Sequence, residues 1–177
     1  MQGGSFLPPF YMYALLRCLI FFAGSATIGV LTSFGGLPKE RGWGMESKKT
    51  LEEVRNLFKE DRFATENGAV IEEIGDHCAT CSLVITDSHR NAMGAVMGGV
   101  YVMLADFAFA VAANWEKMGC VSLRSDISFL GSARGDKLVA KAVCVKDGKT
   151  TASYRVDVTD SLGNLAATVT VTGYHTR

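Results

Sequence analysis

The segment from Met97 to Trp115 constrains the fold most strongly, because it is almost wholly apolar and contains no proline. Its single charged residue is Asp106. A helix that is hydrophobic on all sides is normally buried in the middle of a domain. We therefore predict one long central helix over residues 97–115, with Asp106 as an isolated carboxylate in apolar surroundings.

Strand-like runs lie on both sides of this helix. Two precede it and four follow it, and the breaks between them are rich in glycine and aspartate. Short connections of this kind imply antiparallel neighbours. The simplest layered solution is an α+β domain in which one curved antiparallel sheet wraps the helix. The expected strands cover residues 69–74, 78–86, 120–129, 136–145, 150–159 and 164–173.

A short amphipathic helix is expected ahead of the sheet. Thr50 and Glu53 form a T-x-x-E capping box, and apolar residues at helical spacing continue to about Lys59. Because a single central helix covers only one face of the sheet, the other face and the edges need a second subunit. We predict a homodimer, assembled further into a dimer of dimers, which is a homotetramer.

Residues 1–44 do not resemble the rest of the chain. Their apolar stretch has no periodicity and contains Arg17, and no basic residue precedes it as a secretory signal would require. The uncharged part from Cys18 to Phe34 falls short of the ~20 residues of a spanning helix. We interpret residues 1–44 as an extension created by a start codon assigned too early, with a membrane anchor or a disordered segment as alternatives. The domain would then cover residues 45–177, beginning at Met45.

Composition excludes some partners. Lys and Arg together number 18, as do Asp and Glu, so the chain lacks the basic excess of a nucleic-acid-binding protein. The odd number of cysteines, 5, fits a reducing compartment, and we expect a cytoplasmic protein without stable membrane association. Cys78 and Cys81 form an isolated C-x-x-C that we interpret as structural. The histidines show no metal-ligand spacing, so we expect neither a metal nor another cofactor.

The start of the predicted central helix carries two adjacent glycines, Gly98 and Gly99. Free N–H groups at a helix start carry the positive end of the helix dipole, and glycines let a substrate carbonyl approach closely. Asp106 follows on the same helix. An isolated buried carboxylate is costly, which indicates a functional group, although a hydrogen-bonded core aspartate is the alternative. The sequence has no G-x-S-x-G elbow, which argues against an α/β-type serine hydrolase.

The residues from His89 to Asp106 read H-x-N-x-x-G-x-x-M-G-G-x-x-x-x-L-A-D. This pattern resembles the signature of PaaI-like thioesterases, the phenylacetate-type branch of the hotdog superfamily. The resemblance covers about residues 50–177. It implies the hotdog fold and hydrolysis of acyl-CoA thioesters.

The resemblance also implies roles for individual residues. Asp106 would act as nucleophile or as general base for water, and the backbone amide of Gly98 would polarise the thioester carbonyl. Asn91 would position the water or the leaving thiolate. Ser122, on the strand after the helix, would assist. The family usually has histidine where this chain has Met97, and methionine cannot donate a strong hydrogen bond, so the rate and the substrate preference are expected to differ.

Substrate contacts are expected from residues around this motif. Gly99, His89 and Met97 would border the thioester, although His89 could equally be structural. The basic residues Arg134 and Lys137, together with Arg177, are candidates for the CoA phosphates, with a purely solvated surface as the alternative. The acyl pocket would be lined near Met103, Phe107 and Phe109, unless these side chains form the core.

The leading functional hypothesis is therefore an enzyme that hydrolyses short- to medium-chain or aromatic acyl-CoA thioesters to the free acid and CoA. The alternative is a hotdog module that binds acyl-CoA without turnover. The presence of Met97, and the lack of a histidine close to Asp106 in sequence, motivate that alternative.

Overall fold

The computed structural model describes residues 48–176, so residues 1–47 and Arg177 lie outside the described part. The predicted boundary after residue 44, the start at Met45 and the possible role of Arg177 all concern residues that are not described. The description below is confined to the unit that begins at Ser47.

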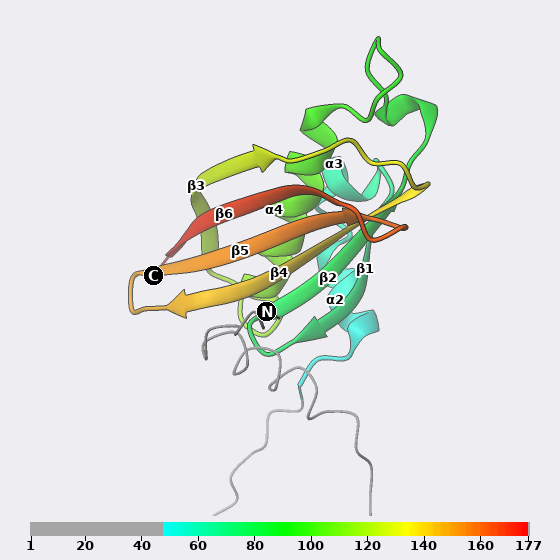
Figure 1. Cartoon of the computed structure of the whole chain (residues 1–177). Coiled ribbons are helices and arrows are strands. Elements are labelled where there is room, and N and C mark those ends of the chain that lie inside the picture. Colours follow the sequence, from blue (N-terminus) through cyan, green and yellow to red (C-terminus); the bar gives the residue numbers. More distant parts are fainter. Residues whose placement is uncertain (1–47, 177) are drawn as a thin grey trace, which may run out of the picture. The chain divides into compact units, whose positions relative to one another are not determined.

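A six-stranded antiparallel sheet curves around one long helix, as predicted (Figure 1). The strand order is β1-β2-β4-β5-β6-β3, which leaves β1 and β3 as the two edges. Each strand begins and ends within a few residues of its predicted bounds. The strands are β1 (Ala69–Gly75), β2 (Cys78–Val84), β3 (Cys120–Phe129), β4 (Lys137–Asp147), β5 (Thr151–Asp160) and β6 (Leu165–His175).

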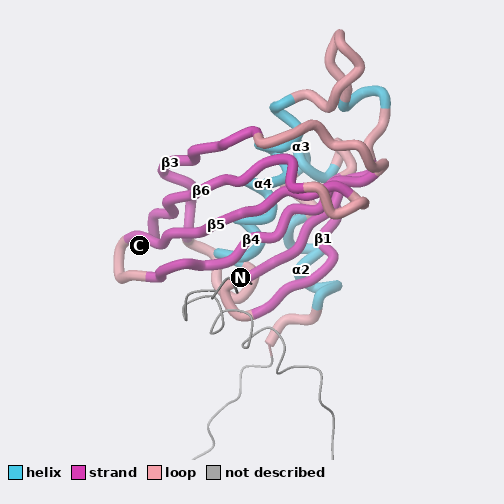
Figure 2. Tube along the Cα trace, viewed as in Figure 1, coloured by secondary structure: helices cyan, strands magenta, loops and turns pink. Residues whose placement is uncertain are grey.

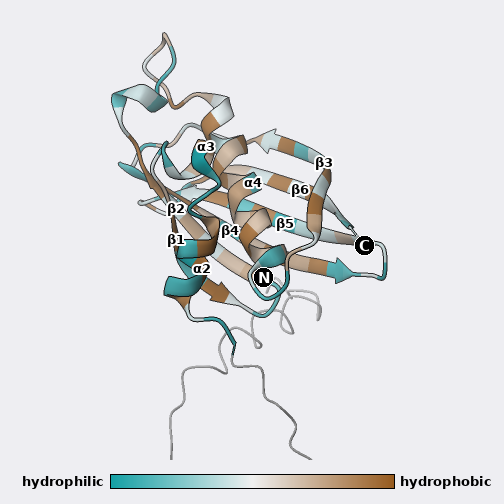
Figure 3. Cartoon of the chain, turned by 180° about the vertical axis from the view of Figure 1, so that it is seen from behind, coloured by the Kyte–Doolittle hydropathy of each residue, from teal (hydrophilic) through white to brown (hydrophobic). Residues whose placement is uncertain are grey.

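The long helix, α4 (Gly98–Asn114), packs against the inner face of the sheet (Figure 3). Leu104, Ala108 and Val111 are fully buried there. The prediction of burial on all sides is wrong, because Val102 and Asp106 on another face are exposed. The sheet covers one side of the helix only, so a single chain leaves this stripe open.

The predicted lead helix is confirmed as α2 (Leu51–Phe58), with Thr50 and Glu53 forming a complete capping box. A short helix, α3 (Arg62–Thr65), and a 3-10 turn, η2 (Asp87–His89), were not predicted (Figure 2). None of the helices in the described residues is long and apolar enough to cross a membrane.

A β-bulge on β3 determines which of its side chains face α4. The pairing with β6 shifts between Ser122 and Arg124, so Leu123 is an extra residue. Ser122 pairs with Gly173 and Phe129 pairs with Ala167, and both partners are buried on the helix side of β6. Residues seven apart on a regular strand would point to opposite faces, whereas the bulge turns both Ser122 and Phe129 toward α4.

Candidate active site

The first turn of α4 presents two unused backbone donors. Met97 is the N-cap and provides no side-chain cap, and the N–H groups of Gly98 and Gly99 have no hydrogen-bond acceptor among residues 48–176. The first bond of the turn runs from the N–H of Val100 to the carbonyl of Met97, at 2.9 Å. Such a helix start can bind an oxyanion or a polarised carbonyl oxygen.

The loop before α4 is organised by Asn91. Its Oδ1 accepts hydrogen bonds from the N–H groups of Met93 at 2.9 Å and Ala95 at 3.1 Å. Its own N–H donates to the carbonyl of Ala95 at 2.8 Å, which closes a tight turn. No described residue accepts a bond from its Nδ2. Asn91 can therefore face a ligand only as a donor.

His89 is held by the protein on both sides of its ring. It is 6% exposed, its Nδ1 accepts from the N–H of Thr86 at 3.0 Å, and its Nε2 lies 3.0 Å from the carbonyl of Asn67. The N–H of Met97 also donates to the carbonyl of His89, at 2.9 Å. These contacts favour the structural interpretation of His89, in which it anchors the loop that leads into α4.

The structure brings Asp106 and Ser122 together. A side-chain hydrogen bond with Ser122 lowers the pKa of the Asp106 carboxyl, but withdrawal from water has the larger effect and the net pKa is raised. Asp106 is nevertheless exposed in the single chain, on the open stripe of α4. The carboxylate is thus accessible to a substrate and more basic than an ordinary aspartate.

A second carboxylate near this site was missed by sequence reasoning. Asp61 is the N-cap residue of α3, yet its side chain makes no capping bond. The pKa of Asp61 is raised mainly by partial burial and, to a smaller extent, by the negative charge of Asp106. Helix α3 lies beside α4, which places the two acidic residues on neighbouring elements (Figure 3). No motif marks Asp61, because its relation to Asp106 depends on the packing of α3.

Two apolar side chains border the free amides. A Cβ atom on Gly98 would lie 3.1 Å from Cζ of Phe129, and one on Gly99 would lie 2.9 Å from Cε of Met97. The ring of Phe129 meets that of Tyr101 edge-on, with centroids 6.1 Å apart. Phe129 was also missed by sequence reasoning, because only the bulge in β3 turns it toward the helix start.

The loop that carries Arg134 is tied to the same end of α4. The N–H of Ala133 donates to Oη of Tyr101 at 3.1 Å. The N–H groups of Arg134 and Gly135 donate to one carboxylate oxygen of the buried Asp160, at 2.8 and 3.2 Å. The side chain of Arg134 is exposed and has no partner among the described residues.

Asp160 joins this loop to the turn between β5 and β6. Its other oxygen accepts from the N–H groups of Leu162 at 3.0 Å and Asn164 at 2.9 Å. The side-chain amide of Asn164 and the backbone N–H groups of Arg134, Asn164 and Gly135 hold the pKa of Asp160 far below its usual value. A buried aspartate with so many donors acts as a structural anchor for both turns.

Lys137 was predicted to contact the CoA phosphates, but its side chain pairs with Glu72. Its Nζ lies 2.7 Å from Oε1 of Glu72, which also accepts a hydrogen bond from Ser82. A phosphate would have to displace this half-exposed ion pair. Arg134 is therefore the better candidate for the CoA phosphates.

The candidate acyl-pocket residues separate into core and surface. Phe107 and Phe109 are 4% and 1% exposed and pack edge-on against Phe58 and Tyr154, so both belong to the core. Met103 is half-buried on the same helix. Of the three candidates, Met103 is the one left partly accessible to an acyl group.

The isolated C-x-x-C lies on β2, where Cys81 is fully buried and Cys78 is half-buried. Burial raises the pKa of Cys81 to about 12, as expected for an inert core thiol. Across residues 48–176, no three His, Cys, Asp or Glu side chains are grouped so as to hold a metal ion.

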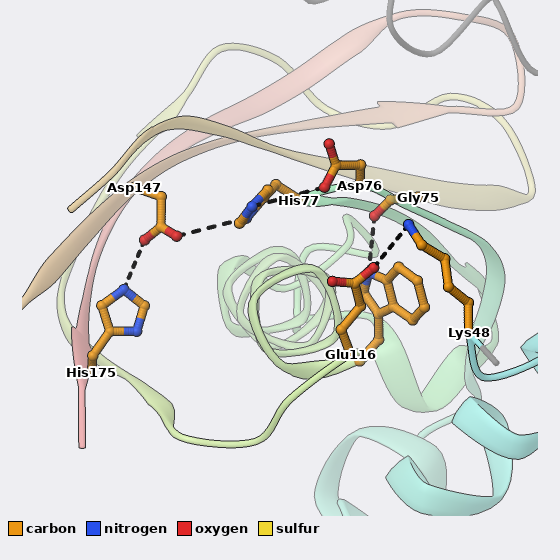
Figure 4. Close-up of polar contacts among 8 residues, drawn as sticks. Lys48, Gly75, Asp76, His77, Glu116, Asp147 and His175 are labelled. Atoms are coloured by element: carbon orange, nitrogen blue, oxygen red, sulfur yellow. Dashed lines mark hydrogen bonds and ion pairs between the residues drawn. The ribbon is translucent and has the colours of Figure 1, made fainter. Parts of the chain in front are cut away.

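A cavity of about 380 Å³ lies at the other end of α4, near Trp115. Asp147 on its wall contacts His175 at 2.7 Å and His77 at 4.0 Å (Figure 4). These residues come from the ends of β4 and β6 and from the β1–β2 turn. The cavity is separate from the Gly98 amides and from Asp106, and its side chains include none of the predicted site residues.

Comparison with known proteins shows which proteins this chain is similar to. Residues 93–167 match the family described as the thioesterase superfamily. A protein of Archaeoglobus fulgidus named as an esterase is 31% identical over 131 residues, which cover 73% of this chain and 85% of that protein. The acyl-coenzyme A thioesterase PaaI of Escherichia coli is 28% identical over 113 residues, covering 63% and 81% of the two chains.

Solved structures show the same fold. The E. coli PaaI protein from the phenylacetic acid degradation operon superposes with a TM-score of 0.66 at 25% identity, covering 69% of this chain and 89% of its own. A hypothetical thioesterase from Streptococcus pneumoniae, solved with coenzyme A, gives a TM-score of 0.62 at 27% identity, covering 67% and 96%.

Proposed function

The chain belongs to the thioesterase superfamily, as a PaaI-like thioester hydrolase with the hotdog fold, and we propose that it hydrolyses short- to medium-chain or aromatic acyl-CoA. Its activity as an acyl-CoA thioesterase in general follows from its relatives. The acyl range and the residue roles are our proposal. The observation that carries them is the position of an accessible, basic Asp106 on the helix whose first amides are free.

In the proposed reaction the thioester carbonyl oxygen accepts hydrogen bonds from the Gly98 amide and its neighbour Gly99. Each such donor typically supplies ~3 kcal/mol of transition-state stabilisation. Asp106 of the same chain lies eight residues, about 12 Å, along the helix from Gly98, so the acting carboxylate is the partner subunit's Asp106 in the dimer proposed below. It either takes a proton from water as the water attacks the carbonyl carbon, or attacks that carbon itself to form an anhydride that water then cleaves. In both routes the C–S bond breaks, and the products are the carboxylate, CoA thiol and a proton.

Asn91 and Ser122 support these steps. The free Nδ2 of Asn91 is a donor, so it suits stabilisation of the leaving thiolate or the carbonyl oxygen rather than acceptance of a proton from water. The hydroxyl of Ser122 lies beside the carboxyl of Asp106, whose pKa it lowers, and is proposed to orient it. His89 contributes indirectly, by holding the loop on which Asn91 lies.

The nucleotide part of CoA is proposed to lie along the loop that carries Arg134. The guanidinium is exposed, and the loop that carries it contacts Tyr101 on the first turns of α4. Guanidinium groups pair well with phosphate oxygens. The thioester would then extend from this loop over Gly98 toward the partner subunit's Asp106.

A homodimer, paired further into a tetramer, is proposed to complete the site. Edge strand β3 exposes Val121 and Leu123 beside the open stripe of α4 that carries Asp106. An edge strand with exposed apolar side chains can pair with another strand, and a two-fold axis would bring two β3 strands together. The substitution Leu123→Lys should weaken the dimer in size-exclusion chromatography with light scattering, whereas Leu162→Lys, on a distant turn, should not.

No metal or redox cofactor is proposed, because a carboxylate and oriented amides suffice for ester hydrolysis. The full rate should therefore persist after dialysis against EDTA. The alternative of a binding module without turnover is set aside, because the relatives include acyl-CoA thioesterases.

A thiol-release assay tests the proposal. The full chain would be assayed with acetyl-, hexanoyl-, benzoyl- and phenylacetyl-CoA, with released CoA measured by a thiol reagent. Catalytic release from at least one of these substrates is expected. A folded protein that binds CoA thioesters but releases no thiol from any of them would contradict the proposed reaction.

A further inference from the structure

Phe129 stands against the first residue of α4. A Cβ on Gly98 would lie 3.1 Å from its Cζ and 3.4 Å from its Cε1, which is tighter than an ordinary carbon contact. The ring therefore lies along the same edge of the helix start as the free amide of Gly98. A carbonyl oxygen bound to that amide, at about 3 Å, lies next to the ring.

The ring is exposed but firmly supported. Phe129 is 56% exposed, whereas Tyr101 beneath it is 4% exposed. The two rings meet edge-on at 70°, and Oη of Tyr101 is fixed by the N–H of Ala133. The loop of Ala133 is in turn anchored by Asp160. This chain of contacts makes the ring a rigid wall, although solvent or a ligand can reach its outer face.

A second apolar wall lies on the other glycine. Cε of Met97 would be 2.9 Å from a Cβ on Gly99, and Met97 is 51% exposed. A thioether side chain bends easily, so this wall can yield. The two amides thus lie between one rigid wall and one flexible wall, both apolar.

We propose that Phe129 is a specificity-determining residue that excludes acyl groups branched at a tetrahedral α-carbon, as distinct from the planar α-carbon of an aromatic acyl group. The inference rests on the proposed binding of the thioester carbonyl by Gly98. The α-carbon is bonded to the carbonyl carbon and so passes along the same walls. A linear chain presents two hydrogens there, whereas a branched chain presents an additional methyl group that the supported ring cannot accommodate.

Butyryl-CoA and isobutyryl-CoA test this proposal, because they are isomers that differ only in branching at the α-carbon. The full chain should favour the butyryl ester in kcat/KM by about tenfold or more, a ratio typical for one misplaced methyl group. In Phe129→Ala the steric contact with the branching methyl group is lost. The ratio of kcat/KM for butyryl-CoA to that for isobutyryl-CoA should therefore fall by about fivefold or more. Leu130→Ala is the matched control, because Leu130 is adjacent and also 56% exposed, and it should keep the wild-type ratio.

An unchanged ratio in a folded Phe129→Ala variant would overturn the proposal. So would a ratio that changes only together with the oligomeric state in size-exclusion chromatography, since that would make Phe129 a subunit contact. Phe129→Leu, which retains apolar bulk, should give an intermediate ratio. Failure of the wild-type chain to hydrolyse either ester, or undiminished hydrolysis by Asp106→Asn, would instead count against the proposed function.

Discussion

Ser122 on β3 lies beside Asp106 on α4 and lowers the pKa of its carboxyl through side-chain hydrogen bonding. The two residues come from an edge strand and from the exposed stripe of the central helix. This hydrogen bonding opposes the effect of burial, which raises the pKa of the same carboxylate. The balance of these two effects sets the pH range in which Asp106 can act as base or nucleophile.

Removing the Ser122 hydroxyl should shift the acid limb of the pH–rate profile. The hydrogen bond lowers the pKa of Asp106, so Ser122→Ala should raise it, and kcat/KM should begin to fall at a higher pH than in the wild type. The lost orientation should also lower kcat by about tenfold. Ser128→Ala, on the opposite face of β3, is the matched control. A Ser122→Ala acid limb at or below the wild-type position would contradict this assignment.

Adding one methyl group at the helix start should damage the oxyanion site. In Gly98→Ala the new Cβ would meet Phe129 at 3.1 Å and stand in the path of the carbonyl. We expect kcat/KM to fall by about 10²-fold, comparable with the loss of one oxyanion donor. Gly131→Ala is the control, because its nearest contact would be an ordinary 3.8 Å. Equal rates for the two variants would argue against carbonyl binding at Gly98.

Restoring an imidazole at the N-cap should accelerate turnover. Met97 lies against Gly99 but offers no hydrogen-bond donor, whereas histidine at this position could donate to the developing oxyanion. We predict that Met97→His raises kcat by about threefold to thirtyfold, which is less than the effect on kcat that one oxyanion-hole donor usually has. Single-turnover kinetics on the preferred substrate would measure it. Met97→Leu, which adds no donor, should not accelerate the reaction, and equal gains in both variants would refute the donor explanation.

Changing Asp160 should affect substrate binding more than chemistry. In Asp160→Asn an amide donor would face backbone donors such as the N–H of Arg134 or that of Leu162, so the loop should loosen and the melting temperature should fall. We expect KM to rise at least about threefold while kcat stays within about twofold, because the loop carries Arg134 rather than Asp106. Asp157→Asn, also on β5, is the control. A fall in kcat with KM unchanged would contradict this role.

The difference in stability between the wild type and Asp160→Asn should also depend on pH. Its pKa is lowered by folding, so its contribution to stability is present above the unfolded value of ~3.9 and is lost as the pH falls through the folded pKa. The difference in melting temperature between the wild type and Asp160→Asn should therefore be greatest at neutral pH. The gap should narrow in strong acid, and a gap that widened on acidification would be inconsistent with the observed hydrogen bonds.

Local signals in the sequence were enough to predict much of this fold. The capping box at Thr50 and Glu53 predicted the start of α2, and the breaks rich in glycine and aspartate predicted the strand ends to within a few residues. The uncharged run predicted α4 but gave the wrong exposure for Asp106. Periodicity reports which residues are apolar, whereas exposure depends on how far the sheet extends around the helix.

The rest of the site depends on contacts between distant segments. The motif from His89 to Asp106 indicated the helix start, but not that His89 is buried as an anchor. The bulge at Leu123 is marked by no glycine or proline, so the orientation of Phe129 could not be read from alternation. Asp61 likewise gains its importance only through the packing of α3 beside α4.

The role of Asp106 is tested most directly by thiol release from the best wild-type substrate in the Asp106→Asn variant, with Asp126→Asn as the exposed carboxylate control. The amide keeps the shape of the side chain but cannot act as base or nucleophile. We predict a loss in kcat of about 10³-fold or more, with acyl-CoA still bound and the melting temperature not reduced. Wild-type turnover in a folded Asp106→Asn variant would show that another group performs the reaction and would contradict the central claim.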